Sequence, residues 1–264
     1  MKYYSSFTIS PENCLLNRAF SYGDGVFETM LCVNQQIPLF ELHWQRLDQS
    51  LTRLRIDSLS KNLINSKINR LIQHLDRCII KIVVFRKDVV RGYASSSSKS
   101  DFVISAHPYS SQQVSNKLTI CSVRLSQQKQ TAGLKHLSRL EQVLASQELI
   151  DSDYQDGIML DKKKRIIETT NKNIIFIKGD EIYSPKLNKS GVYGVALRWL
   201  ETIGYEIKWK NIKLKNINNY QAMMVCNSII GFKKITQINN NIHFNKDHKL
   251  MASIKEKWRD SIKS

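Results

Sequence analysis

Residues 131–149 read TAGLKHLSRLEQVLASQEL. The interpretation of the fold depends on whether Lys135, in this stretch, is a surface residue or a functional one. Apolar residues recur here at intervals of three and four, which predicts one buried helix face beginning at Leu134. Most lysines are solvated, and this chain holds 40 Lys and Arg, so a chemical role for Lys135 needs support from other segments. The apolar positions of the predicted helix face are Leu134, Leu137, Leu140, Val143 and Leu144.

Length and composition restrict the class of protein. A chain of 264 residues with 42% apolar residues can form two lobes, each with its own core. No apolar run approaches the roughly 18 residues that cross a bilayer. The N-terminal MKYYSSFTIS lacks the apolar stretch and cleavage site of a secretory signal. We therefore expect a soluble, cytoplasmic protein that does not bind membranes.

The potential metal ligands and thiols are scattered. Histidines show no metal-binding spacing and no C-x-x-C pair occurs, so neither zinc nor disulfide bonds are expected. The cysteines are expected to be reduced thiols in the core. They are Cys14, Cys32, Cys78, Cys121 and Cys226.

A net charge of +17 allows two interpretations. It could attract nucleic acid or an anionic small molecule, or it could reflect a lineage rich in Lys, Asn and Ile codons. The charge is spread along the chain, and the one dense basic run, Lys162–Arg165, falls at an expected hairpin turn. The sequence therefore favours the lineage bias over nucleic-acid binding, while steering of an acidic substrate remains compatible with it.

Pattern and polarity predict an α+β protein of two domains. Residues 1–108 form an N-terminal α/β lobe, residues 109–116 a polar linker and residues 117–264 a C-terminal lobe of mixed sheets. Helices are predicted at 39–54, 59–77 and 194–205. Strands are predicted at 81–87, 101–107, 117–125, 156–161, 165–170, 173–179, 205–212 and 221–230.

Several motifs follow one another in a definite order around Lys135. Each is weak alone, since YGDG is a common turn and a helical arginine is usually solvated. Together they resemble the fold-type IV family of pyridoxal-phosphate enzymes, which includes branched-chain and D-amino acid aminotransferases and 4-amino-4-deoxychorismate lyases. The motifs are FSYGDGVFET at 20–29, HWQRL at 43–47, RIIETTNKNIIF at 165–176, SGVYGVALR at 190–198 and CNSI at 226–229.

The resemblance implies the two-domain fold of this family and pyridoxal 5'-phosphate as cofactor. By resemblance, Lys135 bonds to the cofactor aldehyde and then serves as the proton-transfer base. Glu168 would hold the proton of the pyridine nitrogen, with Asn173 as its companion. The phosphate would be bound by the helix start at Gly194, Val195 and Ala196, together with Arg46 and Ser228.

Within the family, KHLSRLEQVL and CNSIIGFKKI are similar to the lyase version. The implied reaction converts 4-amino-4-deoxychorismate to 4-aminobenzoate and pyruvate, and the alternatives are an aminotransferase of this fold and, more remotely, a basic nucleic-acid-binding protein without cofactor. Thr29 is expected to act in catalysis and substrate contact, beside Tyr22 and Arg91. The chain has RKDVVRGY where lyases often have a glycine-rich loop. A homodimer is also expected.

Overall fold

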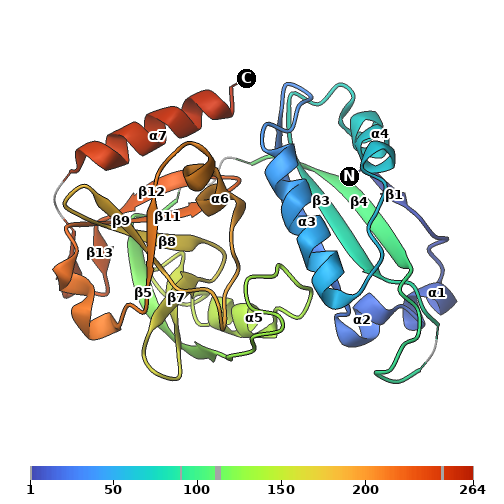
Figure 1. Cartoon of the computed structure of the whole chain (residues 1–264), viewed down its shortest axis with the longest axis horizontal. Coiled ribbons are helices and arrows are strands. Elements are labelled where there is room, and N and C mark those ends of the chain that lie inside the picture. The colour runs from blue at the N-terminus through green and yellow to red at the C-terminus, as the bar shows by residue number, and fades with distance from the viewer. Residues whose placement is uncertain (1, 90, 111–113, 245–246, 264) are drawn as a thin grey trace. The chain divides into compact units, whose positions relative to one another are not determined.

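The computed structural model describes residues 2–89, 91–110, 114–244 and 247–263. The chain divides into two compact units (Figure 1). Unit 1 is Met1–Ser111 with Leu134–Ser138, and unit 2 is Gln112–Gly133 with Arg139–Ser264. Residues 111–113 of the expected linker lie outside the described residues. Both units combine helices with sheets, so the predicted α+β class is confirmed.

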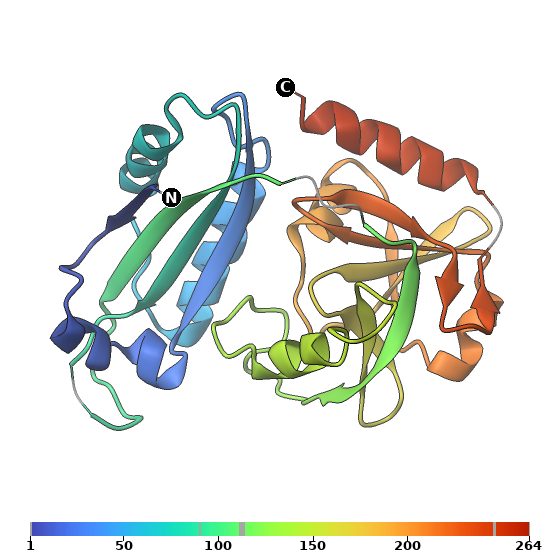
Figure 2. The same ribbon diagram turned by 180° about the vertical axis from the view of Figure 1, so that it is seen from behind.

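Unit 1 is a four-stranded antiparallel sheet covered by two helices (Figure 1). Alternate apolar residues of the strands, such as Val26 and Ile80, pack against the apolar faces of the two longer helices, α3 (Phe40–Leu54) and α4 (Lys61–Ile72), in one buried cluster. Figure 2 shows the same sheet from behind. The sheet order is β1 (Lys2–Ser5), β4 (Ser100–Pro108), β3 (Arg77–Arg86) and β2 (Gly25–Val33), with helices α1 (Pro11–Leu15), α2 (Arg18–Tyr22), α3 (Phe40–Leu54) and α4 (Lys61–Ile72).

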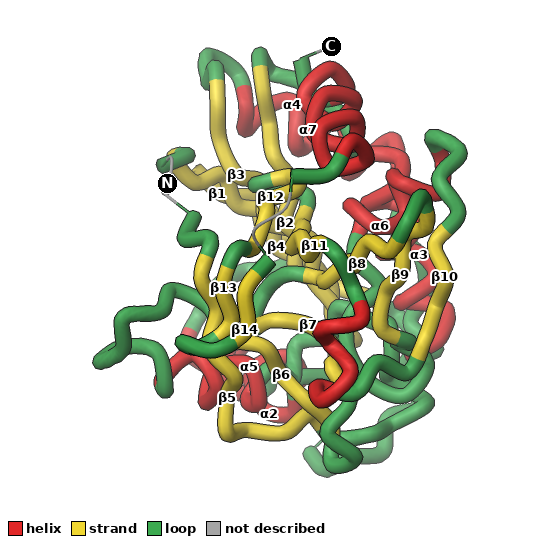
Figure 3. The backbone as a smooth tube through the Cα atoms, turned by 90° about the vertical axis from the view of Figure 1, so that its left-hand side faces the viewer, coloured by secondary structure: helices red, strands yellow, loops and turns green. Residues whose placement is uncertain are grey.

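Unit 2 contains two five-stranded sheets, and the strands of the first can be followed in Figure 3. Helix α6 (Val195–Thr202) contacts β11, and α7 (Lys249–Ser261) contacts β12, where Trp258 packs against Phe232. The order of this sheet is β10 (Ile207–Lys210), β9 (Glu181–Pro185), β8 (Asn173–Lys178), β11 (Ala222–Asn227) and β12 (Gly231–Ile235).

The second sheet of unit 2 carries the hairpin with the basic run. Asp161 accepts hydrogen bonds from the backbone N–H groups of Lys163 (2.9 Å) and Arg165 (3.0 Å), which closes the expected turn. The order is β14 (Ile242–His243), β13 (Gln237–Ile238), β5 (Lys117–Leu125), β6 (Gly157–Asp161) and β7 (Ile166–Thr169), with helix α5 (Leu140–Gln147) against β5 and a 3₁₀ helix, η1 (Leu214–Asn219).

The prediction of a helix starting at Leu134 is wrong. Helix α5 begins only at Leu140, and Leu140, Val143 and Leu144 are 68%, 51% and 49% exposed. The preceding residues are not helical because their backbone groups bond elsewhere. The Gly133 N–H donates to the Gly191 carbonyl (2.8 Å), and the Gly133 carbonyl accepts from the Tyr193 N–H (3.0 Å). Pairing with other segments has overridden a local helical pattern.

The described residues show neither a membrane-spanning helix nor a metal-binding cluster. Across 2–89, 91–110, 114–244 and 247–263, no helix has both the length and the apolar character required to cross a bilayer. Within the same ranges, no group of three or more His, Cys, Asp or Glu side chains is arranged to hold a metal ion. The five cysteines are free thiols.

Candidate active site

Lys135 lies on a short extended segment that pairs with the edge strand β2 of the sheet in unit 1. The Phe27 N–H donates to the Lys135 carbonyl oxygen and the Leu137 N–H to the Gly25 carbonyl oxygen, each at 2.9 Å. Val26 and His136 form the bridge between the two segments. Strand β2 is at the edge of the sheet, so its free backbone groups can bind this segment. The pairing places Lys135 opposite Phe27, on the same face of the sheet.

The side chain of Lys135 lies over an aromatic ring. Its Nζ is 4.2 Å from the centroid of the Phe27 ring, and the Nζ of Lys81 is 5.3 Å from the same centroid. Lys81 pairs in register with Thr29, so Thr29, Lys81 and Lys135 share one face of unit 1. Sequence reasoning missed Lys81, although alternation in KIVVFRK puts it on the face opposite to the core.

Behind this face, strand β2 and helix α3 form a buried ionic network. The Glu28 carboxylate accepts bonds from Arg46 Nε (2.7 Å) and Arg46 Nη2 (2.6 Å) and lies 2.6 Å from His43 Nδ1. Glu28, His43 and Arg46 are 2%, 1% and 4% exposed. Burial raises the pKa of Glu28, but the charges and hydrogen bonds of Arg46 and His43 outweigh burial and lower this pKa to about 2.

For His43, burial has a larger effect on the pKa than the neighbouring opposite charge has. Burial lowers its pKa more than the Glu28 carboxylate raises it, and the positive charges of Arg46 and Lys135 lower it further. Neutral His43 can donate its Nδ1 proton to Glu28. The sequence prediction noted Arg46 within HWQRL but missed His43 and Glu28, whose helix-to-strand pairing is visible only in three dimensions.

Glu168 occupies a buried position in unit 2, on strand β7. Its Oε2 accepts from the Val192 N–H (2.8 Å), its Oε1 is 3.4 Å from Gln142 Nε2, and the residue is 5% exposed. Strand β7 sits at the edge of its sheet, with β6 as its only strand neighbour among the described residues. The arrangement holds an acidic side chain away from water.

Asn173 and Gly194 belong to the same region of unit 2. The Asn173 amide nitrogen donates to the Val192 carbonyl oxygen (2.8 Å). A Cβ on Gly194 would lie 2.0 Å from Asn173 Oδ1, so only glycine fits. Gly194 caps helix α6 in an extended conformation without a side-chain hydrogen bond, and Val195 and Ala196 begin the helix buried. The first amide groups of this helix are thus suited to bind an anion.

Ser228 lies in the turn between β11 and β12 and is partly buried. The preceding Asn227 shapes this turn, because its Oδ1 accepts from the N–H groups of Ile229 and Ile230, each at 3.0 Å. The prediction identified Ser228 from CNSI but not the structural role of Asn227, whose short polar side chain is typical of such turns.

The residues predicted for substrate binding all lie in unit 1. Thr29 is partly buried on β2, Tyr22 ends helix α2, and Arg91 is exposed on the loop after β3. The other arginine of the RKDVVRGY segment, Arg86 at the end of β3, is unsuited to a substrate. Its guanidinium donates to the carbonyls of Leu54 (2.7 Å), Arg55 (2.8 Å) and Ser97 (2.8 Å). Arg91 is the better candidate of the two.

The family follows from comparison with known proteins. The family model of class IV aminotransferases matches residues 25–238, which is most of the chain. The chain belongs to the aminotransferase class IV family. The matched range includes Lys135 and Glu168 and all of the residues predicted to bind cofactor.

Class IV relatives extend over different parts of the chain. An aminodeoxychorismate lyase of Vibrio harveyi is 30% identical over 84% of this chain and 86% of its own length. A protein described as a probable branched-chain-amino-acid aminotransferase of Rickettsia bellii is 27% identical over 44% of this chain and 42% of its own. The crystal structure of the 4-amino-4-deoxychorismate lyase of Pseudomonas aeruginosa matches with a TM-score of 0.86 and 27% identity, covering 98% of both chains.

A class IV site needs an amine, an acid and an anion-binding helix start, and the residues of this chain fit these needs. Unit 1 holds the amine of Lys135, and unit 2 holds the buried carboxylate of Glu168, which accepts one backbone hydrogen bond. The close approach of Asn173 to Gly194 leaves no space for a side chain at the start of α6. These features within each unit suit pyridoxal 5'-phosphate.

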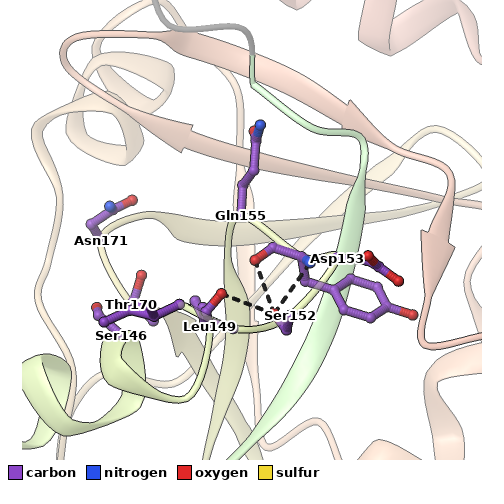
Figure 4. A pocket seen from close by; sticks show the side chains of 9 residues that line it. Ser146, Leu149, Ser152, Asp153, Gln155, Thr170 and Asn171 are labelled. Atoms are coloured by element: carbon purple, nitrogen blue, oxygen red, sulfur yellow. Dashed lines mark hydrogen bonds between the residues drawn. The ribbon is translucent and has the colours of Figure 1, made fainter.

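A separate hollow of about 500 Å³ lies in unit 2 (Figure 4). Its polar groups bond to their own surroundings: the Ser152 hydroxyl donates to the carbonyl of Leu149 (3.1 Å), and the Thr170 hydroxyl donates to Asp156 (2.8 Å). The residues that line it, none of them predicted for the active site, are Ser146, Leu149, Ile150, Ser152, Asp153, Tyr154, Gln155, Thr170 and Asn171.

Proposed function

We propose that this class IV enzyme is a lyase that converts 4-amino-4-deoxychorismate to 4-aminobenzoate and pyruvate. The observation that carries the proposal is the likeness to the Vibrio harveyi lyase, which is 30% identical and spans 84% of this chain. A protein described as a putative branched-chain-amino-acid aminotransferase of Methanocaldococcus jannaschii covers 90% of the chain but is only 23% identical to it. The lyase-like KHLSRLEQ at 135–142 supports the same choice.

We assign pyridoxal 5'-phosphate as the cofactor. Lys135 would hold the cofactor through its aldehyde until the substrate amine takes that place, and Glu168 would keep the ring nitrogen protonated. The amides of Gly194, Val195 and Ala196 bind the phosphate, with Ser228 and Arg46 as the further predicted contacts. When bound, the cofactor supplies an electron sink for the pair left at a deprotonated carbon. Glu28 orients Arg46 through two hydrogen bonds from its guanidinium.

The chemical step is a proton transfer followed by an elimination. Lys135 Nζ removes the proton from the ring carbon that bears the substrate amine. The carbon–oxygen bond to the neighbouring enolpyruvyl group then breaks, that group leaves as pyruvate after taking up a proton, and the ring becomes aromatic. Thr29 lies on the same face of unit 1 as Lys135, where its hydroxyl can contact the substrate or relay the proton.

The substrate carries two carboxylates, which require cationic partners. Arg91 is exposed on its loop, and Lys81 lies over the same Phe27 ring as Lys135. We assign these two cations to the substrate, since Arg86 is engaged with backbone carbonyls.

The test is a direct assay of the purified protein. Incubation with 4-amino-4-deoxychorismate should produce fluorescent 4-aminobenzoate, and borohydride should trap the cofactor on the peptide that contains Lys135. Lys135→Arg should abolish both signals, whereas Lys61→Arg on the surface of α4 should retain them. Transamination of D-alanine or leucine without 4-aminobenzoate would refute the lyase proposal in favour of an aminotransferase.

We also propose that the enzyme is a cytoplasmic homodimer. Free thiols at all five cysteines suit a reducing compartment. The exposed apolar side chains of α5, namely Leu140, Val143 and Leu144, support contact with a second copy of the chain. Sedimentation velocity should show a species of twice the chain mass, and Leu144→Glu should weaken it. A wild-type monomer at micromolar concentration would refute the dimer.

A further inference from the structure

Arg18 is a buried arginine that neither the family motifs nor the proposed chemistry uses. It begins helix α2 and is 3% exposed. Its Nε donates to Asp24 Oδ2 (2.8 Å), its Nη1 to the Gly92 carbonyl (3.0 Å) and its Nη2 to the Tyr93 carbonyl (2.8 Å). A buried guanidinium is costly unless it is fully bonded, and here every nitrogen has an acceptor. Two of these acceptors are on the loop after β3.

Tyr22, at the other end of α2, binds the same part of the loop. The Gly92 N–H donates to the Tyr22 hydroxyl (2.9 Å), and the rings of Tyr22 and Tyr93 meet edge to face with centroids 5.4 Å apart. Both backbone polar groups of Gly92 are therefore bound by α2. Gly92 has a φ of +94°, which favours glycine, so the backbone here is held in one particular conformation.

A second arginine holds the far end of this loop. Arg86 donates to the Ser97 carbonyl (2.8 Å) and, through Nε, to Asp24 Oδ2 (3.0 Å). The carboxylate of Asp24 thus joins Arg18 to Arg86. Two arginines and one carboxylate hold the backbone at Gly92, Tyr93 and Ser97. The side chains of Arg91 and Tyr93 remain exposed, the latter at 88%.

We propose that Arg18 is a positioning residue for substrate binding: it fixes Gly92 and Tyr93 so that Arg91 is presented to a carboxylate of the anionic substrate. This inference rests on the proposed function. An exposed arginine loses conformational entropy when it binds an anion, and a backbone held in advance reduces that loss. The buried network gives rigidity to a loop that has only one glycine in RKDVVRGY.

The test compares Arg18→Lys, Tyr22→Phe and the control Arg70→Lys, which lies on the exposed surface of α4. Lysine keeps a charge for Asp24 but cannot reproduce the planar fork that reaches two carbonyls. In the holoenzyme, Arg18→Lys should raise KM for 4-amino-4-deoxychorismate about tenfold while kcat changes less than about twofold. Tyr22→Phe, which loses one hydrogen bond, should shift KM in the same direction by less.

A second readout is independent of the reaction. Trypsin should cut after Arg91 several times faster in Arg18→Lys than in wild type or Arg70→Lys, as followed by mass spectrometry. Unchanged cleavage and unchanged KM in both loop variants would overturn the inference, and so would a parallel loss of kcat and cofactor content. A wild-type enzyme without lyase activity would refute the proposed function and the substrate role together, while the cleavage rates would still decide whether Arg18 anchors the loop.

Discussion

Glu28→Gln tests the buried network behind the face that carries Lys135. Glutamine has nearly the same shape as glutamate, so packing is retained, but in the cofactor-free protein Arg46, buried at 4% exposure, would lose the carboxylate that accepts two of its hydrogen bonds. The variant therefore isolates the charge of Glu28. Loss of one partner from a buried ion pair is strongly destabilising because the other charge is left uncompensated.

The expected loss in the free energy of unfolding follows from the pKa of Glu28. This pKa falls from its ordinary value of 4.5 to about 2 in the folded protein. A displacement of that size corresponds to about 3 kcal/mol of stability at pH 7. The stabilisation is present above the unfolded pKa and is lost as pH falls through the folded pKa, so it should decline to about 2 kcal/mol near pH 3.5. A typical domain tolerates this loss and stays folded.

The assay is urea unfolding read by pulsed hydrogen exchange and mass spectrometry. Peptides from β2 and β3 report unit 1, and peptides from β8 and β11 in unit 2 are the internal reference. Glu41→Gln on α3 is the matched control, since its bridge to Lys61 is exposed and should contribute less than about 1 kcal/mol. A loss below about 1 kcal/mol for Glu28→Gln at pH 7, or a loss that does not change with pH, would refute this reasoning.

Three further substitutions test the assigned roles. Lys135→Ala should lower kcat by about a thousandfold or more, measured as 4-aminobenzoate release, and residual activity near wild type would exclude it as the base. Glu168→Gln should lower kcat about a hundredfold with cofactor still bound by absorbance, and an unchanged kcat would remove its role. Gly194→Ala should lower phosphate-dependent cofactor affinity and destabilise unit 2 by about 1–3 kcal/mol, because the new Cβ would overlap Asn173; an unchanged melting temperature would contradict this overlap.

Several strands were easier to predict than the segment that carries Lys135, although β2 was not among the predicted strands. Strand β5 was predicted with its observed bounds, because β-branched residues and flanking turns mark it clearly. The apolar spacing from Leu134 to Leu144 instead spans an extended segment and a short helix. Spacing of three and four residues describes a local preference, and the hydrogen bonds to β2 that override it connect residues about a hundred positions apart in sequence.

Some residues of the candidate site lie in recognisable sequence motifs, and others do not. Lys135, Glu168 and Gly194 could be predicted as candidates because ordered motifs surround them. Lys81 and Arg18 could not, since each is a single cation among 40 Lys and Arg. What distinguishes Lys81 is a shared aromatic ring, and what distinguishes Arg18 is a set of carbonyl acceptors 74 and 75 residues away. Neither property leaves a local pattern in the sequence.

Strand β2 links the stability of unit 1 to the placement of the Lys135 amine. Successive residues of a strand point to opposite faces, so Glu28 faces the helices while Phe27 and Thr29 face the other way. A slip of one residue would exchange these faces. Gly25 opposes such a slip, because a Cβ there would lie 2.4 Å from the Val84 carbonyl and this strand end pairs closely with β3. The register that buries the Glu28 carboxylate beside Arg46 is therefore the same register that sets Phe27 and Thr29 on the face of Lys135.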